Sequence, residues 1–113
     1  MDLINKSISN TLFNHKKRIN KIIKLKNIYL ASCSDDFDIN ICNIITTDFI
    51  KTIMDNFIVY SILLLKDNIL LSSNYNGLLC KWNWETSQIY HTIKIKTIII
   101  RIYDMFGLED FVF

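Results

Sequence analysis

The sequence predicts an all-β protein built from antiparallel four-stranded units. Apolar and polar residues alternate in "DINICNI", where Ile39, Ile41 and Ile44 keep a period of two apart from one slip at the end. Turn-forming clusters separate the apolar runs: "SDDFD" at 34–38, "KDN" at 66–68 and "NYNG" at 74–77. The chain also repeats itself, and this third observation suggests how many strands form one unit.

The internal repeat emerges when the sequence is shifted by about 40 positions without gaps, a spacing typical of four-stranded propeller blades. Apolar matches alone would reflect the high Ile content, but serine, asparagine and threonine positions stay in step as well. The identical pairs are Ile22/Ile62, Leu25/Leu65, Lys26/Lys66, Leu30/Leu70, Ser32/Ser72, Asn43/Asn83, Thr46/Thr86, Thr52/Thr92 and Ile53/Ile93.

The expected strands follow the chain in order. The run "FIVYSILLL" at 57–65 is expected to be a buried strand, because it is too short to span a bilayer. Two strands at 70–73 and 78–82 flank the pair Asn76-Gly77, which suits a tight turn with two positive φ angles. A rival α+β interpretation makes residues 46–65 a helix, with Thr47 or Asp48 as its N-cap.

Composition places the chain among small globular domains. It has 113 residues, half of them apolar, no Pro, 2 Gly and a formal net charge of +2, a charge too small to indicate nucleic-acid binding by itself. Three cysteines are an odd number, and the start "MDLINKSISN" is too polar for a signal peptide. We therefore expect reduced thiols and a cytoplasmic or nuclear location.

The stretch "LLSSNYNGLLCKWN" at 70–83 resembles the "LaSgSxDGtvkiWD" line of WD40 repeats, with Trp82-Asn83 where Trp-Asp usually stands. Residues 30–43, "LASCSDDFDINICN", repeat that line, and "ETSQIYHTIK" resembles a fourth strand. The resemblance implies a β-propeller with about two and a half blades. Its parts are 1–14 (fourth strand of a preceding blade, at about Lys6 to Phe13), 15–54 and 55–96 (whole repeats), and 97–113 (the first two strands of a truncated third).

WD40 blades often carry a hydrogen-bonded tetrad of His, Ser, Asp and Trp, which ties the loop before the first strand to the third strand. By resemblance, the first repeat has His15, Ser32 and Asp36, with Cys42 in place of Trp. The second repeat has Ser72, Asn76 and Trp82, with Asp55 in place of His. The resemblance gives these residues a structural role.

Catalysis and metal binding are disfavoured by the same residues. His15, Ser32 and Asp36 carry the groups of a hydrolase triad, but a strand serine in a propeller is buried and lacks oxyanion donors. The histidines and cysteines have no close zinc-ligand spacing. We therefore expect no enzyme activity, no cofactor and no metal.

A basic stretch at 15–26 supports a different kind of function. It contains Lys16, Lys17, Arg18, Lys21, Lys24 and Lys26. One interpretation is a patch that binds RNA or an anionic membrane, and the other is an ordinary solvated face.

The preferred function is a non-enzymatic protein-interaction scaffold of the WD40 type, with protein partners that the sequence does not name. Propellers close with four to eight blades. We therefore expect either a truncated gene product or a ring completed by another copy or another chain.

Overall fold

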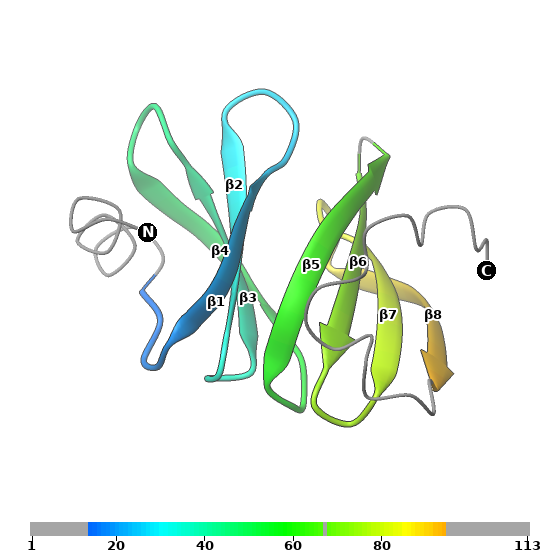
Figure 1. Ribbon diagram of the computed structural model, residues 1–113. Coiled ribbons are helices and arrows are strands. Elements are labelled where there is room, and N and C mark those ends of the chain that lie inside the picture. Colours follow the sequence, from blue (N-terminus) through cyan, green and yellow to red (C-terminus); the bar gives the residue numbers. More distant parts are fainter. Residues whose placement is uncertain (1–13, 67, 95–113) are drawn as a thin grey trace.

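The computed structural model describes residues 14–66 and 68–94, and this part of the chain is built from strands without any helix. Figure 1 shows the strands as two separate groups along the chain. Their bounds are β1 (Ile19–Lys24), β2 (Tyr29–Ser34), β3 (Asp38–Asn43), β4 (Asp48–Met54), β5 (Val59–Lys66), β6 (Ile69–Asn74), β7 (Leu78–Asn83) and β8 (Gln88–Lys94).

The strands form two four-stranded antiparallel sheets, ordered β1-β2-β3-β4 and β5-β6-β7-β8. Within each sheet, strands that are consecutive in the sequence pair with one another, so each sheet is a meander of three hairpins. The all-β prediction is confirmed. The rival helix over residues 46–65 is wrong, because β4 and most of β5 occupy that range. The β-branched and aromatic residues of this range suit a pleated, half-buried surface better than a helix.

The expected strand positions agree with the structure wherever it describes them. The run at 57–65 gives β5, while Ile39 and Ile41 are fully buried in β3 and Ile44 lies beyond its end, exposed. The strand expected at Lys6 to Phe13 lies outside the described residues, and so do the two strands expected within 97–113. Of the expected segments, 1–14 is described only at residue 14, and 97–113 is not described.

The turn between β6 and β7 differs from the expected type. Gly77 has a φ of 74°, but Asn76 is not among the described residues with positive φ, so the expectation of two positive angles is wrong for Asn76. The Gly77 N–H donates to the Asn74 carbonyl at 3.0 Å, which indicates a type I turn followed by one left-handed residue. In the first sheet, Phe37 takes the same place with a φ of 78°, an unusual conformation for a bulky side chain.

The turns between the third and fourth strand of each sheet share one design. Asn43 Oδ1 accepts the N–H groups of Ile45 and Thr46 at 2.9 and 3.0 Å. Asn83 does the same for Glu85 and Thr86 at 2.9 and 3.2 Å. An asparagine oxygen that replaces a backbone acceptor in this way is an Asx turn. The matched asparagines of the sequence repeat therefore begin equivalent turns.

The main hydrophobic core lies between the two sheets. Cross-strand partners share a face, so Ala31 with Ile41 and Cys33 with Ile39 place one apolar face of the first sheet against the second. The second sheet contributes Val59, Ile62, Leu70, Cys80, Trp82 and Trp84 to the same cluster. The opposite face of the first sheet holds a smaller cluster in which Cys42 is surrounded by Ile19, Ile22 and Leu30.

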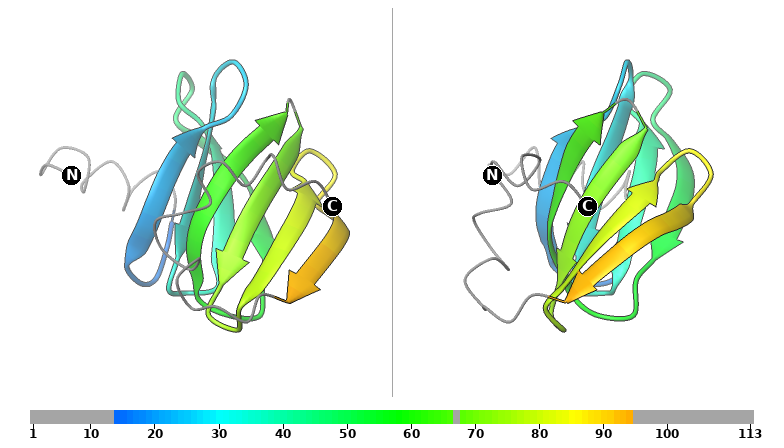
Figure 2. Two further views of the ribbon diagram at one scale, coloured as in Figure 1. Left: turned by 45° about the vertical axis from the view of Figure 1, so that its right-hand side comes forward. Right: turned by 90° about the vertical axis from the view of Figure 1, so that its right-hand side faces the viewer.

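Strands β1 and β5 lie side by side where the sheets meet, as the views of Figures 1 and 2 agree. The Asn20 side-chain amide donates to the Val59 carbonyl at 2.9 Å, and Lys21 Nζ donates to Ser61 Oγ at 3.3 Å. Further from this junction, the rings of Tyr29 and Trp84 lie 5.6 Å apart, centroid to centroid. Polar contacts at β1 and β5 and apolar contacts beyond them fix the two sheets together.

Candidate functional site

The first sheet carries a hydrogen-bonded group centred on His15, in the loop before β1. Its Nδ1 lies 3.0 Å from Asp36 Oδ2, and its Nε2 lies 2.6 Å from Ser32 Oγ. Since a carboxylate only accepts hydrogen bonds, Nδ1 carries the proton shared with Asp36. The loop before the first strand is thereby tied to β2 and to the β2–β3 turn.

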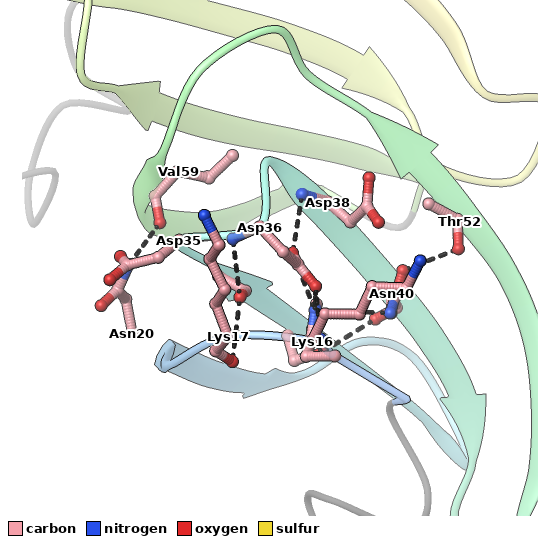
Figure 3. Close-up of polar contacts among 12 residues, drawn as sticks. Lys16, Lys17, Asn20, Asp35, Asp36, Asp38, Asn40, Thr52 and Val59 are labelled. Atoms are coloured by element: carbon pink, nitrogen blue, oxygen red, sulfur yellow. Dashed lines mark hydrogen bonds and ion pairs between the residues drawn. The ribbon is translucent and has the colours of Figure 1, made fainter.

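Asp36 is held by the backbone as well as by His15. The N–H groups of Lys16 and Asp38 donate to its two oxygens at 2.9 and 3.0 Å (Figure 3). Burial alone would raise the pKa of the Asp36 carboxyl, but these N–H groups and His15 outweigh burial and lower the pKa. Asp36 therefore remains ionised and fixes the loop and the turn at once.

Asn40 and Thr52 extend the first-sheet group to β3 and β4. Thr52 Oγ1 donates to Asn40 Oδ1 at 2.8 Å (Figure 3), and the Ser32 hydroxyl lies 3.5 Å from the Asn40 carbonyl oxygen. Asn40 lies two residues before Cys42 in β3, on the same face of the sheet. With Cys42 in the tryptophan position, Asn40 and Thr52 are the polar groups that carry this network to the outer strands.

In the second sheet, two of the residues singled out by the sequence form a hydrogen bond. Trp82 Nε1 donates to Ser72 Oγ at 2.9 Å, and the indole is buried, with 8% of the residue exposed. A buried tryptophan needs such an acceptor for its single N–H group. The Asn76 side chain is exposed and makes no hydrogen bond in the described part of the chain; its backbone N–H donates to Asn74 Oδ1 at 3.0 Å.

Asp55, the counterpart of His15 in the sequence repeat, bonds to Asn74 and not to the predicted Asn76. Asn74 Nδ2 donates to Asp55 Oδ1 at 3.0 Å, and Asn74 Oδ1 accepts the N–H of Leu78 at 3.2 Å. Burial raises the pKa of Asp55, although three N–H donors oppose the shift. The sequence repeat does not reveal the role of Asn74, because its counterpart is Ser34, which is smaller and has no side-chain amide. A turn asparagine followed by Gly77 was the available signal.

The three cysteines are buried and free. Burial raises the pKa of the Cys33 thiol to about 12, and it also raises the pKa values of Cys42 and Cys80. Protonated, enclosed thiols are poor nucleophiles and poor metal ligands. Within residues 14–66 and 68–94, no group of three or more His, Cys, Asp or Glu side chains is placed to hold a metal ion.

The basic residues of 15–26 do not act as one surface. Lys16, Lys17, Arg18 and Lys24 are exposed. Lys21 instead bonds to Ser61 in the second sheet, and Lys26 Nζ lies 3.6 Å from Glu85 Oε1. Two of the six cations therefore contribute to contacts between the sheets. The charged patch that remains consists of Lys16, Lys17, Arg18 and Lys24.

The chemistry available at His15 is limited by access. Its contacts have the acid–base–hydroxyl order of a hydrolytic triad, but Ser32 is completely buried. A nucleophilic serine must reach its substrate, and a developing oxyanion needs donors beside it. The geometry therefore fits a structural anchor between strands and loops.

No helix in the described part of the chain is long and apolar enough to cross a bilayer.

Two four-stranded meanders packed face to face, each tied at one end by part of a His-Ser-Asp-Trp set, define consecutive blades of a β-propeller. The fold is similar to that of the WD40 β-propeller domain of Doa1, with a TM-score of 0.64 and 18% sequence identity. The match covers 72% of this chain and 28% of that one, so the chain spans little more than a quarter of that structure. No protein-family profile matches the sequence, and no curated protein does.

Proposed function

We propose that this chain is a non-enzymatic protein-interaction scaffold of the WD40 type, which associates with a further blade-like sheet from a second copy or another chain. The fold supports the coarse part of this proposal, because propellers of this type act through their surfaces. The partner's nature follows from one feature of the first sheet.

The first sheet bears an apolar face whose counterpart in the second sheet is fully covered. Ile19, Ile22 and Leu30 are half-buried. Their partners in the sequence repeat, Val59, Ile62 and Leu70, are 0% exposed because the first sheet packs on them. Ile44 is 39% exposed, whereas its counterpart Trp84 is 4% exposed. This difference carries the proposal: the face around Cys42 matches a type of surface that this fold buries against a neighbouring sheet.

Light scattering coupled to size exclusion, over a range of protein concentrations, tests the association. We expect the mean mass to rise with concentration, and Ile22→Glu to suppress that rise because it buries a charge in the contact. Ile45→Glu is the matched control, since Ile45 is 71% exposed in the β3–β4 hairpin. A concentration-independent monomer with native strand content, in the presence of every candidate partner tested, would contradict the proposal.

The alternative of a basic module for RNA or anionic membranes has less support, because Lys21 and Lys26 bind other residues of the chain. Phosphate contacts would show as binding that falls steeply with salt, and we expect no such binding. We also infer a cytoplasmic or nuclear location from the three free, buried thiols. Imaging of the tagged protein in its own cells tests this inference.

A further inference from the structure

Asp55 connects the two sheets at one point of the chain. It lies between β4 and β5, and its backbone N–H donates to the Phe37 carbonyl at 2.9 Å, in the β2–β3 turn of the first sheet. Its side-chain Oδ1 accepts from Asn74, in the β6–β7 turn of the second sheet, at 3.0 Å. One residue thus joins equivalent turns of both sheets.

The two oxygens of this carboxyl group have very different surroundings. Oδ1 accepts the N–H groups of Asn56 and Phe57, at 2.6 and 3.2 Å, in addition to the amide of Asn74. Oδ2 is buried and has no hydrogen-bond partner among the described residues, and the whole residue is 9% exposed. An ionised oxygen without a donor is costly to bury, and a neutral hydroxyl at the same place costs much less.

The groups around Asp55 offer no compensating positive charge. In the described part of the chain no cation forms an ion pair with it. From β7 it faces the Cys80 thiol, whose pKa is raised by burial and then by the Asp55 charge. Lys94 of β8 reaches the Asn76 carbonyl instead. In the first sheet, Asp36 and Asp38 flank Phe37, and both are acids.

We propose that Asp55 is a proton-controlled latch, defined as the contacts of residue 55 with the Phe37 and Asn74 turns. The packing that makes these contacts buries Oδ2 without a donor, so it holds the sheets together more firmly when the carboxyl group is neutral than when it is ionised. The latch would regulate how firmly the two sheets keep their mutual orientation. It goes beyond the proposed scaffold function and does not depend on the identity of any partner.

The sign of the pH effect follows from the raised pKa of Asp55, which burial causes. Below the usual aspartate pKa both the folded and the unfolded chain are protonated, and the latch stabilises fully. As the pH rises, the unfolded chain ionises first, so stability is lost until the pH exceeds the folded-state pKa. Above that value the loss is complete and constant.

Thermal melting of Asp55→Asn against the parent protein measures this loss. We expect the parent melting temperature to fall by on the order of 5 °C across this window, and Asp55→Asn to remove most of that fall. Asp38→Asn is the necessary comparison, because burial and Asp36 also raise the pKa of Asp38. Asp48→Asn, at an exposed site in β4, should leave the pH dependence unchanged.

A carbon-13 NMR titration of the Asp55 carboxyl group in the unaltered protein provides a second readout, which needs no variant to fold. We expect a midpoint clearly above the usual aspartate value. A midpoint at or below that value would overturn the latch, as would an Asp55→Asn protein that keeps the full pH dependence of its parent. Neither result bears on whether the chain binds partners, so the scaffold proposal is tested separately.

Discussion

The two sheets tie their loops and strands together with different members of the His-Ser-Asp-Trp set. The first has His15, Ser32 and Asp36 in hydrogen-bonded contact but no tryptophan. The second has Trp82 bonded to Ser72, with Asp55 at the position that matches His15, and Asp55 with Asn74 closes its turn. The comparison teaches that packing and polar bonding are separable here: the second sheet depends on a large buried indole, and the first on a charged hydrogen-bond group.

The largest expected effect comes from removing the indole. Trp82→Ala should destabilise the protein by about 3–5 kcal/mol, because a large buried aromatic is replaced by a cavity and Ser72 loses its donor. Cys42→Ala, at the matching position of the first sheet, should cost much less, because little volume is removed. Chemical denaturation of both variants measures the difference, and equal costs would show that the two sheets are anchored alike.

Removing the histidine should have the next largest effect. His15→Ala leaves Ser32 and Asp36 without their partner and should cost about 2 kcal/mol, within the range for buried polar groups that lose a hydrogen bond. Asp55→Ala at the matching position of the second sheet should cost less, because it also removes a buried acid. Denaturant melts followed by circular dichroism give both values; a His15→Ala protein as stable as its parent would contradict the assigned role.

The turn at Phe37 offers a stabilising change. Phe37 has a φ of 78°, where the second sheet has Gly77. Phe37→Gly should stabilise the protein by about 1 kcal/mol, because glycine adopts this angle without strain between Cβ and the backbone. Gly77→Phe is the reciprocal variant and should destabilise by a similar amount. A Phe37→Gly protein that melts below its parent would show that the exposed ring contributes more than its backbone strain costs.

The smallest expected effect is the loss of stability at low pH that arises from protonation of Asp36. The pKa of Asp36 is lowered in the folded protein, because the hydrogen bonds it accepts outweigh its burial. Its contribution is therefore fully present above the usual aspartate pKa and is lost as the pH falls through the lower folded-state value. The burial of Asp36 opposes the lowering of its pKa, so the melting temperature should change by only a few degrees. Asp36→Asn should flatten the acid limb, whereas Asp48→Asn should not.

The strands followed from the sequence because their signals are local and repeated. Alternation at Ile39 and Ile41, and the matched Asn43 and Asn83, need no knowledge of the rest of the fold. The substitution at Cys42 was also visible, because a tryptophan stands at the same place in the second repeat. Local patterns therefore located the strands.

The remaining site features depend on three-dimensional neighbours. Asn74 replaces Asn76 in the second network because its amide reaches across a turn to Asp55, and no spacing rule encodes that reach. The positive φ of Phe37 was hidden because phenylalanine rarely takes it. The contact of Lys26 with Glu85 joins residues of two different sheets. Each of these features arises from how two segments meet, which one sequence cannot specify.

The meander order of both sheets has a consequence for folding speed. Within each of the two described sheets, consecutive strands pair with one another, so most backbone contacts close short loops and the contact order of each sheet is low. Contacts between the sheets, such as Asn20 to Val59, close a much longer loop. Low contact order favours rapid formation, whereas long-range closure is slow. Each meander is therefore expected to form early, and docking of the two meanders is expected to be the slower step that sets the refolding rate.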